Sequence, residues 1–258
     1  MHGKPESSMA RLEHVQQRTI IITGGTRGIG RACALRLAAD GHRLILGYAR
    51  NHDAAAEVLA EVQALGAECL TVCSDLTTDD GIETLFSAAE SWAPRIDGVV
   101  NNAGATLHVG PLVNTPTDVI RRVIDLNLTS AVLVARRALQ ALPAGGVLVN
   151  VSSGAATTGA PGEYVHYSAA KAGVDALTKG LAIEAAPHNV RVVGVAPGTI
   201  DTDVHADAGD PERASRVAAR HPMGRVGRPE EVAEVIAFAL SPAASYVSGT
   251  MIRVAGGM

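Results

Sequence analysis

A tyrosine and a lysine four residues apart, Tyr167 and Lys171, are the side chains in this sequence whose types and spacing best suit chemistry. On a helix, residues four apart share a face, so the phenol and the ammonium would meet. An ammonium about 4 Å from a phenol, at an effective dielectric of about 20, favours the phenolate by about 4 kcal/mol, or roughly 3 pKa units. We therefore expect the pKa of Tyr167 to fall from about 10 toward neutrality, which makes it a proton donor and acceptor. A tyrosine and a lysine on a solvated helix face would have the same spacing. The other motifs must therefore decide between a catalytic pair and two surface residues.

A glycine-rich stretch over residues 23–30, TGGTRGIG, is the second candidate site. Gly24, Gly28 and Gly30 permit positive φ, close approach of the backbone to a pyrophosphate, and tight packing of a helix on a strand. The amino terminus of the following helix offers free amides and positive potential to phosphates. No Gly-Lys-Ser/Thr follows, which argues against a P-loop NTPase.

The end of the second expected strand bears on the choice of cofactor. An NAD site usually places a carboxylate there for the ribose hydroxyls, but residues 47–51, GYARN, include no acid. Arg50, together with Arg27, could instead meet a 2′-phosphate, which suits a planar guanidinium. Either arginine could also be solvated. The sequence favours NADP(H) over NAD(H).

The elements that must position these residues are short apolar runs alternating with longer helical patterns. We expect strands at residues 19–22, 44–46, 69–72, 98–100, 147–151, 190–195 and 251–254, and helices at 28–39, 52–65, 79–92, 117–142, 167–186 and 229–240. Uniformly apolar strands are typical of a sheet covered on both faces. The order predicts an α/β, Rossmann-type doubly wound fold with a seven-stranded parallel sheet and helices on both faces. Ligands on such sheets bind at the carboxyl ends of the strands, where each motif falls.

Composition limits the alternatives. The 258 residues, 47% hydrophobic and 19% charged, suit one NADP-binding domain over residues 18–258, preceded by a flexible tail over residues 1–17. A net charge of -4 gives no basic footprint for nucleic acid or an anionic membrane. No apolar run reaches the roughly 18 residues of a membrane span.

Cysteine and histidine usage argues against a metal site. The three cysteines form no CxxC, and the nine histidines show no ligand spacing such as HExxH. We expect no metal and a reducing cytoplasmic location, with Cys69 and Cys73 as small buried thiols in a strand.

The motifs follow the strands in a fixed order: the glycine loop, Asn101-Asn102-Ala103-Gly104, Ser153, the Tyr167/Lys171 pair and Pro197-Gly198. Over residues 18–257 this set resembles the classical short-chain dehydrogenase/reductase family, and the ordered set is far more specific than any one motif. The resemblance implies an NAD(P)-dependent oxidoreductase that interconverts a carbonyl and a secondary alcohol.

The resemblance also implies roles for individual residues. Tyr167 would exchange a proton with the substrate oxygen, and Ser153 would polarise that oxygen. Lys171 would lower the pKa of the phenol and bind the nicotinamide ribose, while Asn127 would complete a proton relay through water. The cofactor supplies the hydride chemistry. The expected cofactor-binding residues are Gly24, Thr26, Arg27, Gly28, Ile29, Gly30, Arg50, Asn51, Asp75, Leu76, Asn102, Ala103, Gly104, Tyr167, Lys171, Pro197, Gly198, Ile200 and Thr202.

Several of these residues have plainer interpretations. Ser152 could replace Ser153 as the active hydroxyl, but Ser153 matches the second serine of the family's Val-Ser-Ser pattern. Its interval to Tyr167 is one residue longer than the family's common spacing, and we place the extra residue in the loop 157–164. Tyr164 is not an alternative to Tyr167, because the residue four positions later is Ser168 and not a lysine. Asn127 could cap or kink its long helix, and Asp75 could belong to an ordinary turn.

Substrate contacts in this family come from three loops, here residues 105–116, 154–166 and 201–220, the last of which we expect to be a lid of short helices. Their polar residues are Thr106, His108, Glu163, His166, His205 and Asp207. We therefore expect a small polar, sugar- or polyol-like substrate rather than a steroid or a long acyl chain.

Two other functions stay open. A 3-oxoacyl-[acyl-carrier-protein] reductase would need a basic rim for its acidic partner, but residues 140–144, QALPA, include no lysine or arginine, and His188 stands where a second basic residue is expected. A catalytically inactive NADP-binding sensor or scaffold is less favoured, because all four catalytic residue types are present. Small residues along helix 167–186 let another element approach closely, either within one copy or between copies. The resemblance implies that this helix and helix 117–142 pair between copies, into a homotetramer or homodimer.

Overall fold

The computed structural model describes residues 17–258, so the predicted tail, apart from Gln17, lies outside the described residues. Seven strands form one all-parallel sheet in the order β3-β2-β1-β4-β5-β6-β7. The strands are β1 Thr19–Thr23, β2 Arg43–Tyr48, β3 Cys69–Cys73, β4 Gly98–Asn101, β5 Val147–Val151, β6 Arg191–Pro197 and β7 Met251–Val254. The predicted doubly wound fold is confirmed.

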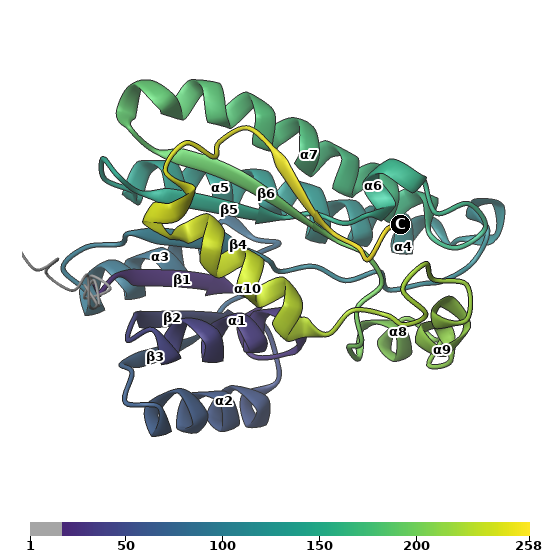
Figure 1. Cartoon of the computed structure of the whole chain (residues 1–258), viewed down its shortest axis with the longest axis horizontal. Helices are drawn as coiled ribbons and strands as arrows, with labels where there is room; N and C mark the ends of the chain where they lie inside the picture. Colours follow the sequence, from purple (N-terminus) through teal and green to yellow (C-terminus); the bar gives the residue numbers. More distant parts are fainter. Residues whose placement is uncertain (1–16) are drawn as a thin grey trace, which may run out of the picture.

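Helices connect the strands (Figure 1). They are α1 Gly28–Ala39, α2 His52–Ala64, α3 Asp79–Trp92, α4 Thr117–Ile124, α5 Ser130–Ala141, α6 Ala155–Thr158, α7 Val165–Ala185, α8 Val204–Asp207, α9 Arg213–Ala218 and α10 Pro229–Leu240. Most bounds lie within two residues of those expected from periodicity. The four-residue helix α6 was not predicted, because one helical turn is too short to show a period.

The sheet separates two hydrophobic cores because strand side chains alternate between its faces. In β1, Ile20 and Ile22 pack into the core shared with α1, α2 and α10. Ile21 points the other way, into the core shared with α3, α5 and α7. All three isoleucines are fully buried, so burial of both faces explains the uniformly apolar strands.

The predicted continuous helix over residues 117–142 was wrong in its middle. A π-helical turn, Asp125–Thr129, separates α4 from α5. The fully buried Asn127 donates from Nδ2 to the Val123 carbonyl at 2.9 Å, so a side chain competes with the backbone ladder at this turn. The interruption matches the alternative that Asn127 kinks the helix, and π-helical turns are frequent at functional sites.

The strand order reverses between β1 and β4, and the loops that follow these two strands are tied together. Thr23 Oγ1 accepts from the backbone amides of Asn102 and Ala103, each at 2.9 Å. Asn102 Nδ2 donates to the Thr23 carbonyl at 2.9 Å. This switch point is where open α/β sheets bind ligands.

The cysteines differ from expectation at one position. Cys33 is buried and Cys69 is partly buried, but Cys73 is exposed, so the prediction for Cys73 was wrong. Cys73 is the last residue of β3 at the edge of the sheet, where no further strand covers it. Among the described residues, no helix is long and apolar enough to cross a membrane.

Candidate active site

The structure brings Ser153, Tyr167 and Lys171 together beyond the carboxyl end of β5. Tyr167 and Lys171 lie on one face of α7, with the Lys171 Nζ 5.7 Å from the centroid of the phenol ring. Ser153 follows β5 and hydrogen-bonds with the Tyr167 side chain. Lys171 is only 4% exposed, and its Nζ donates to the Val151 carbonyl at 3.0 Å.

The expected fall in the pKa of Tyr167 was wrong. Burial raises the pKa of this phenol to about 12, while the hydrogen bond with Ser153 and the charge of Arg213 act in the opposite direction. The Lys171 ammonium bonds the Val151 carbonyl rather than the phenol. Loss of hydration therefore outweighs the charges around Tyr167.

Burial also disfavours the charge on Lys171. It lowers the pKa of the ammonium to about 8, against an opposing contribution from Asp175. An ammonium that loses its proton close to physiological pH can take part in proton exchange.

The two candidate serines have different surroundings. Ser152 Oγ is tied to the Lys171 carbonyl at 3.1 Å and to the Asp175 carboxylate, inside the protein. Ser153 Oγ accepts from the Ala155 amide at 3.1 Å and bonds Tyr167. The geometry thus favours Ser153 over Ser152 as the hydroxyl beside the phenol.

Asn127 lies against the loop that follows β4. Its Nδ2 donates to the Ala105 carbonyl at 2.8 Å, and its Oδ1 accepts from the Ala105 amide at 3.2 Å. A Cβ on Gly104 would lie 2.5 Å from Asn127 Oδ1 and 3.4 Å from Lys171 Nζ. Gly104 is therefore the place where the asparagine and the lysine face the same backbone.

The glycine loop has the shape that a dinucleotide requires. Gly24 and Gly28 adopt positive φ, 62° and 50°. A Cβ on Gly30 would lie 2.0 Å from the Gly24 carbonyl oxygen, so only glycine allows this approach of α1 to the loop. No side chain caps the amino terminus of α1 at Arg27, which leaves its amides for an anion. These residues fit the pyrophosphate of a nicotinamide cofactor.

Other expected cofactor residues have structural partners. Asn51 caps α2 by accepting from the Ala54 amide at 3.0 Å. Asp75 Oδ1 accepts from the Thr77 amide at 3.0 Å and the Thr77 hydroxyl at 2.7 Å, which is the turn considered as its alternative. Those hydrogen bonds, with a smaller contribution from Arg50, lower the pKa of Asp75.

Among the remaining expected cofactor residues, Thr26 follows β1, Leu76 follows β3, and Ile200 and Thr202 follow β6. Leu76 and Ile200 are buried in the two cores, and Thr26 is also buried. Thr202 lies over the loop, with its Cγ2 3.2 Å from the position of a Cβ on Gly28. The described residues contain no group of three or more His, Cys, Asp or Glu side chains that could hold a metal.

The lid contains the short helices α8 and α9, which lie at the side to which the strand arrows point (Figure 1). It is fastened at two points. Asp207 of α8 pairs with Arg27 of the glycine loop at 3.1 Å. Arg213 of α9 pairs with Glu163 at 2.7 Å. A lone arginine in a polar segment carries no signal in sequence, so Arg213 was missed.

The polar residues of the substrate loops are not all on the surface. Thr106 and His166 are buried, and the Thr106 hydroxyl has no hydrogen-bond partner. Glu163 and Asp207 are taken up by the two lid contacts. The side chain of His205 lies outside what the structure describes.

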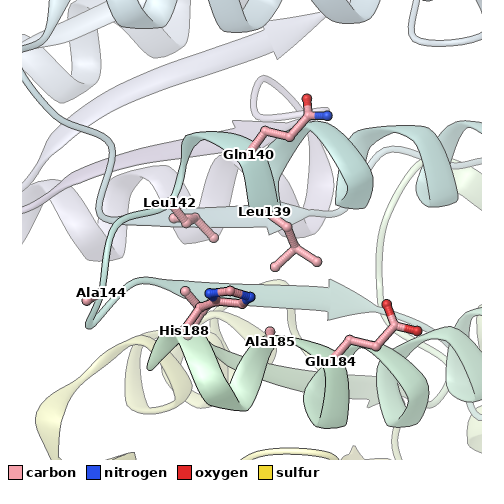
Figure 2. A pocket seen from close by; sticks show the side chains of 8 residues that line it. Leu139, Gln140, Leu142, Ala144, Glu184, Ala185 and His188 are labelled. Atoms are coloured by element: carbon pink, nitrogen blue, oxygen red, sulfur yellow. The ribbon is translucent and has the colours of Figure 1, made fainter.

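A cavity of about 510 Å³ lies between the carboxyl ends of α5 and α7 (Figure 2). It is lined by Leu139, Gln140, Leu142, Ala144, Glu184, Ala185, His188 and Val190. These residues precede β5 and β6, so the cavity is at the amino edge of the sheet, away from Tyr167. Its lining includes no lysine or arginine.

The chain is similar to known proteins over nearly its whole length. The family model described as "Enoyl-(Acyl carrier protein) reductase" matches residues 24–258. The chain is 40% identical over 242 residues to "Uncharacterized oxidoreductase YgfF" of Escherichia coli, covering 92% of this chain and 98% of that protein. It is 39% identical to a 3-oxoacyl-[acyl-carrier-protein] reductase of Synechocystis, covering 92% and 95%.

The chain is also similar to a sugar dehydrogenase and to a solved structure. An L-rhamnose 1-dehydrogenase (NAD(P)(+)) of Sphingomonas is 35% identical over 95% of this chain and 97% of its own length. The solved structure of a short-chain dehydrogenase/reductase from Serratia marcescens superposes with a TM-score of 0.88 at 28% identity, covering 94% of this chain and 98% of the other.

Proposed function

Because this chain belongs to the classical short-chain dehydrogenase/reductase family and is an NAD(P)-dependent enzyme acting on CH–OH groups, we propose that it is an NADP(H)-preferring oxidoreductase. It interconverts a carbonyl and a secondary alcohol on a small polar, sugar- or polyol-like substrate. The observation that carries the proposal is the meeting of Ser153, Tyr167 and Lys171 next to Gly104.

The chemistry follows from what each side chain can do. Tyr167 gives its phenol proton to the carbonyl oxygen during reduction and takes it back during alcohol oxidation. Ser153 donates a hydrogen bond to that oxygen and holds it near the phenol. Lys171, whose pKa is lowered to about 8 by burial, replenishes the proton, and Asn127 positions the backbone at Gly104.

The glycine loop and residues 102–104 would hold the cofactor, which supplies or accepts the hydride. The free amides at the start of α1 bind its phosphates, and Thr202 would close over the loop from the lid. Because the loop after β4 bonds the Gly24 carbonyl through Asn102 and brings Gly104 beside the Lys171 ammonium, it connects the cofactor loop to the acid–base pair.

The substrate class rests on the polar character of the lid and loops. The relatives named above act on a sugar and on a carrier-bound acyl group, so similarity alone does not select between them. Two assays test the proposal: formation of NADPH from NADP⁺ with L-rhamnose-type aldoses, and consumption of NADPH with keto-polyols, acetoacetyl thioesters and 3-keto steroids. Turnover highest with the sugars supports it, and turnover highest with the thioester replaces it with the acyl reductase.

We predict that NADPH binds at least tenfold tighter than NADH, about 1.4 kcal/mol. The guanidiniums of Arg27 and Arg50 are the groups that would meet the 2′-phosphate. Fluorescence titration of both cofactors against the protein and against Arg50→Gln measures the preference. Equal affinities in the wild-type protein would refute the roles given to the two arginines.

Asp207 should weaken that preference, because it competes for Arg27. The ion pair is about half exposed on both sides and is worth no more than about 1 kcal/mol. We expect Asp207→Asn to bind NADPH about threefold tighter and NADH unchanged, in low-salt titrations. Asp203→Asn removes the same charge from the lid without touching this ion pair, so it should leave both affinities as they are.

Assembly and location complete the proposal. Ala169, Ala172, Ala176 and Gly180 form an exposed small-residue face on α7, next to the 78% exposed Ile183. Such a face lets another helix approach, so we propose that copies pair there into a homotetramer or homodimer, which light scattering after gel filtration would measure. The three unpaired cysteines support a cytoplasmic location.

A further inference from the structure

The lid contains an arginine that is buried although the lid is otherwise largely exposed. Arg213 is 5% exposed, whereas the side chain of Arg216, one turn later in α9, is 57% exposed. Removing a guanidinium from water is costly unless it is paired and hydrogen-bonded. The position of Arg213 therefore requires specific partners inside the protein.

Those partners come from the wall of the candidate active site. Arg213 donates from Nη2 and Nε to the same Glu163 carboxylate oxygen, at 2.7 and 3.2 Å. Its Nη1 lies 3.5 Å from the Thr199 hydroxyl, just after β6. The arginine thus joins α9 to two segments that are 50 and 14 residues away in the sequence.

An aromatic contact continues from the arginine to the reacting phenol. The guanidinium carbon lies 5.0 Å from the centroid of the Tyr164 ring, a cation–π distance. The Tyr164 ring meets the Tyr167 ring edge to face, at 5.5 Å and 88°. Tyr164 is 8% exposed, so it is held between the lid arginine and the catalytic tyrosine.

The charged and titratable groups around Tyr167 can be named from each element. Lys171 comes from its own helix, Tyr164 from the segment before that helix, Ser153 from the end of β5, and Arg213 from α9 with its partner Glu163. Of these, Arg213 and Ser153 lower the pKa of Tyr167 against the effect of burial.

We propose that Arg213 is a positioning residue for the reaction assigned above. Through Glu163 it holds α9 of the lid against the active-site wall, through Tyr164 it supports the ring of Tyr167, and its charge favours the phenolate. This inference rests on the proposed function for its kinetic part only, because the lid contact exists independently of turnover.

The kinetic test is the pH dependence of kcat/KM for alcohol oxidation with NADP⁺, using the alcohol that the wild-type protein oxidises best in the substrate panel. At each pH below the pKa of the phenol, Arg213→Gln should lower kcat/KM about tenfold, because a phenol pKa raised by about one unit leaves one tenth of the phenolate. Arg213→Lys keeps the charge and should keep the wild-type kcat/KM across the same pH range. A kcat/KM of Arg213→Gln equal to that of the wild type at every pH overturns the electrostatic role.

The second test needs no substrate or cofactor. Trypsin can cut the lid after the exposed Arg216 and Arg220, and cleavage should be about tenfold faster in Arg213→Gln and in Glu163→Gln. Ser215→Ala, an exposed change on the same helix that leaves both arginines in place, should be cut at the wild-type rate. If both Arg213→Gln and Glu163→Gln are cut at the wild-type rate, the proposed lid contact of Arg213 with Glu163 is overturned.

The double variant Arg213→Gln/Glu163→Gln guards against misfolding, since it replaces the ion pair with two amides of similar shape and leaves no unpaired charge. It should retain cooperative unfolding and still show the lowered kcat/KM for alcohol oxidation. If Tyr167→Phe turns over at the wild-type rate, the proposed function fails, while the trypsin result still decides the lid contact.

Discussion

Replacing Tyr167 with phenylalanine should reduce kcat for NADPH-dependent carbonyl reduction by about 10³-fold, because general acid–base catalysis contributes about 10² to 10⁴. The substitution removes only the hydroxyl, so the ring contact with Tyr164 and the packing on α7 persist. Affinity for NADPH should change little. Stopped-flow measurement of NADPH oxidation with the best panel substrate, together with fluorescence titration of the cofactor, checks both statements.

A matched control is available for this variant. Tyr246 is fully exposed, so Tyr246→Phe removes a tyrosine hydroxyl far from the site and should leave kcat unchanged. A Tyr167→Phe protein that keeps a rate within tenfold of the wild type would show that another group transfers the proton. Retained NADPH binding in such a protein would point to Ser153 or Lys171 as that group.

Replacing Lys171 with methionine should lower the activity of the protein and raise its stability. Loss of the ammonium removes the group that replenishes the phenol proton, so kcat should fall by about 10²-fold. At pH 7 the unfolding free energy should rise, because the pKa of Lys171 is lowered by burial from 10.5 to about 8, which corresponds to about 3 kcal/mol of unfavourable charge burial. Losing the hydrogen bond to the Val151 carbonyl offsets about 1 kcal/mol.

The pH dependence of the unfolding free energy tests whether the pKa of Lys171 is lowered in the folded protein. Between pH 8 and 10.5 the unfolded chain binds the Lys171 proton and the folded chain does not, so the wild type gains stability relative to Lys171→Met as the pH rises through this window. The advantage of the variant should be full below pH 8 and gone by 10.5. Urea unfolding at several pH values measures it, with the exposed Lys179→Met as control. A difference independent of pH would contradict the lowered pKa.

Strands, helices and the ordered motifs were predictable because each depends on residues close together in the chain. Helix α3 was placed at Asp79–Trp92 from its own periodicity, ending before Pro94, and the structure shows Thr78 capping its start. The glycine loop could be read from spacing because the backbone angles at Gly24 and Gly28 are local properties. The relation between Tyr167 and Lys171 likewise follows from the turn of one helix.

The features that the sequence did not predict share a physical cause: they depend on burial and on partners distant in sequence. The π-helical turn arises from the buried amide of Asn127, which donates to the Val123 carbonyl of its own helix and to the Ala105 carbonyl of the loop after β4. The exposure of Cys73 follows from the position of β3 at the edge of the sheet. The spacing of nearby residues determines neither the strand order nor the extent of burial.

From the sequence alone came the fold class, the place of the site at the carboxyl ends of the strands, and the pairing of a phenol with an amine, since these follow from periodicity and order. Only the tertiary structure decided the electrostatics of that pair. Spacing predicts that Lys171 lowers the pKa of Tyr167, but burial raises it, and the opposing charge is on Arg213, in a lid 46 residues beyond Tyr167 in the chain. Desolvation and long-range charge depend on which segments enclose a group, and folding alone determines that enclosure.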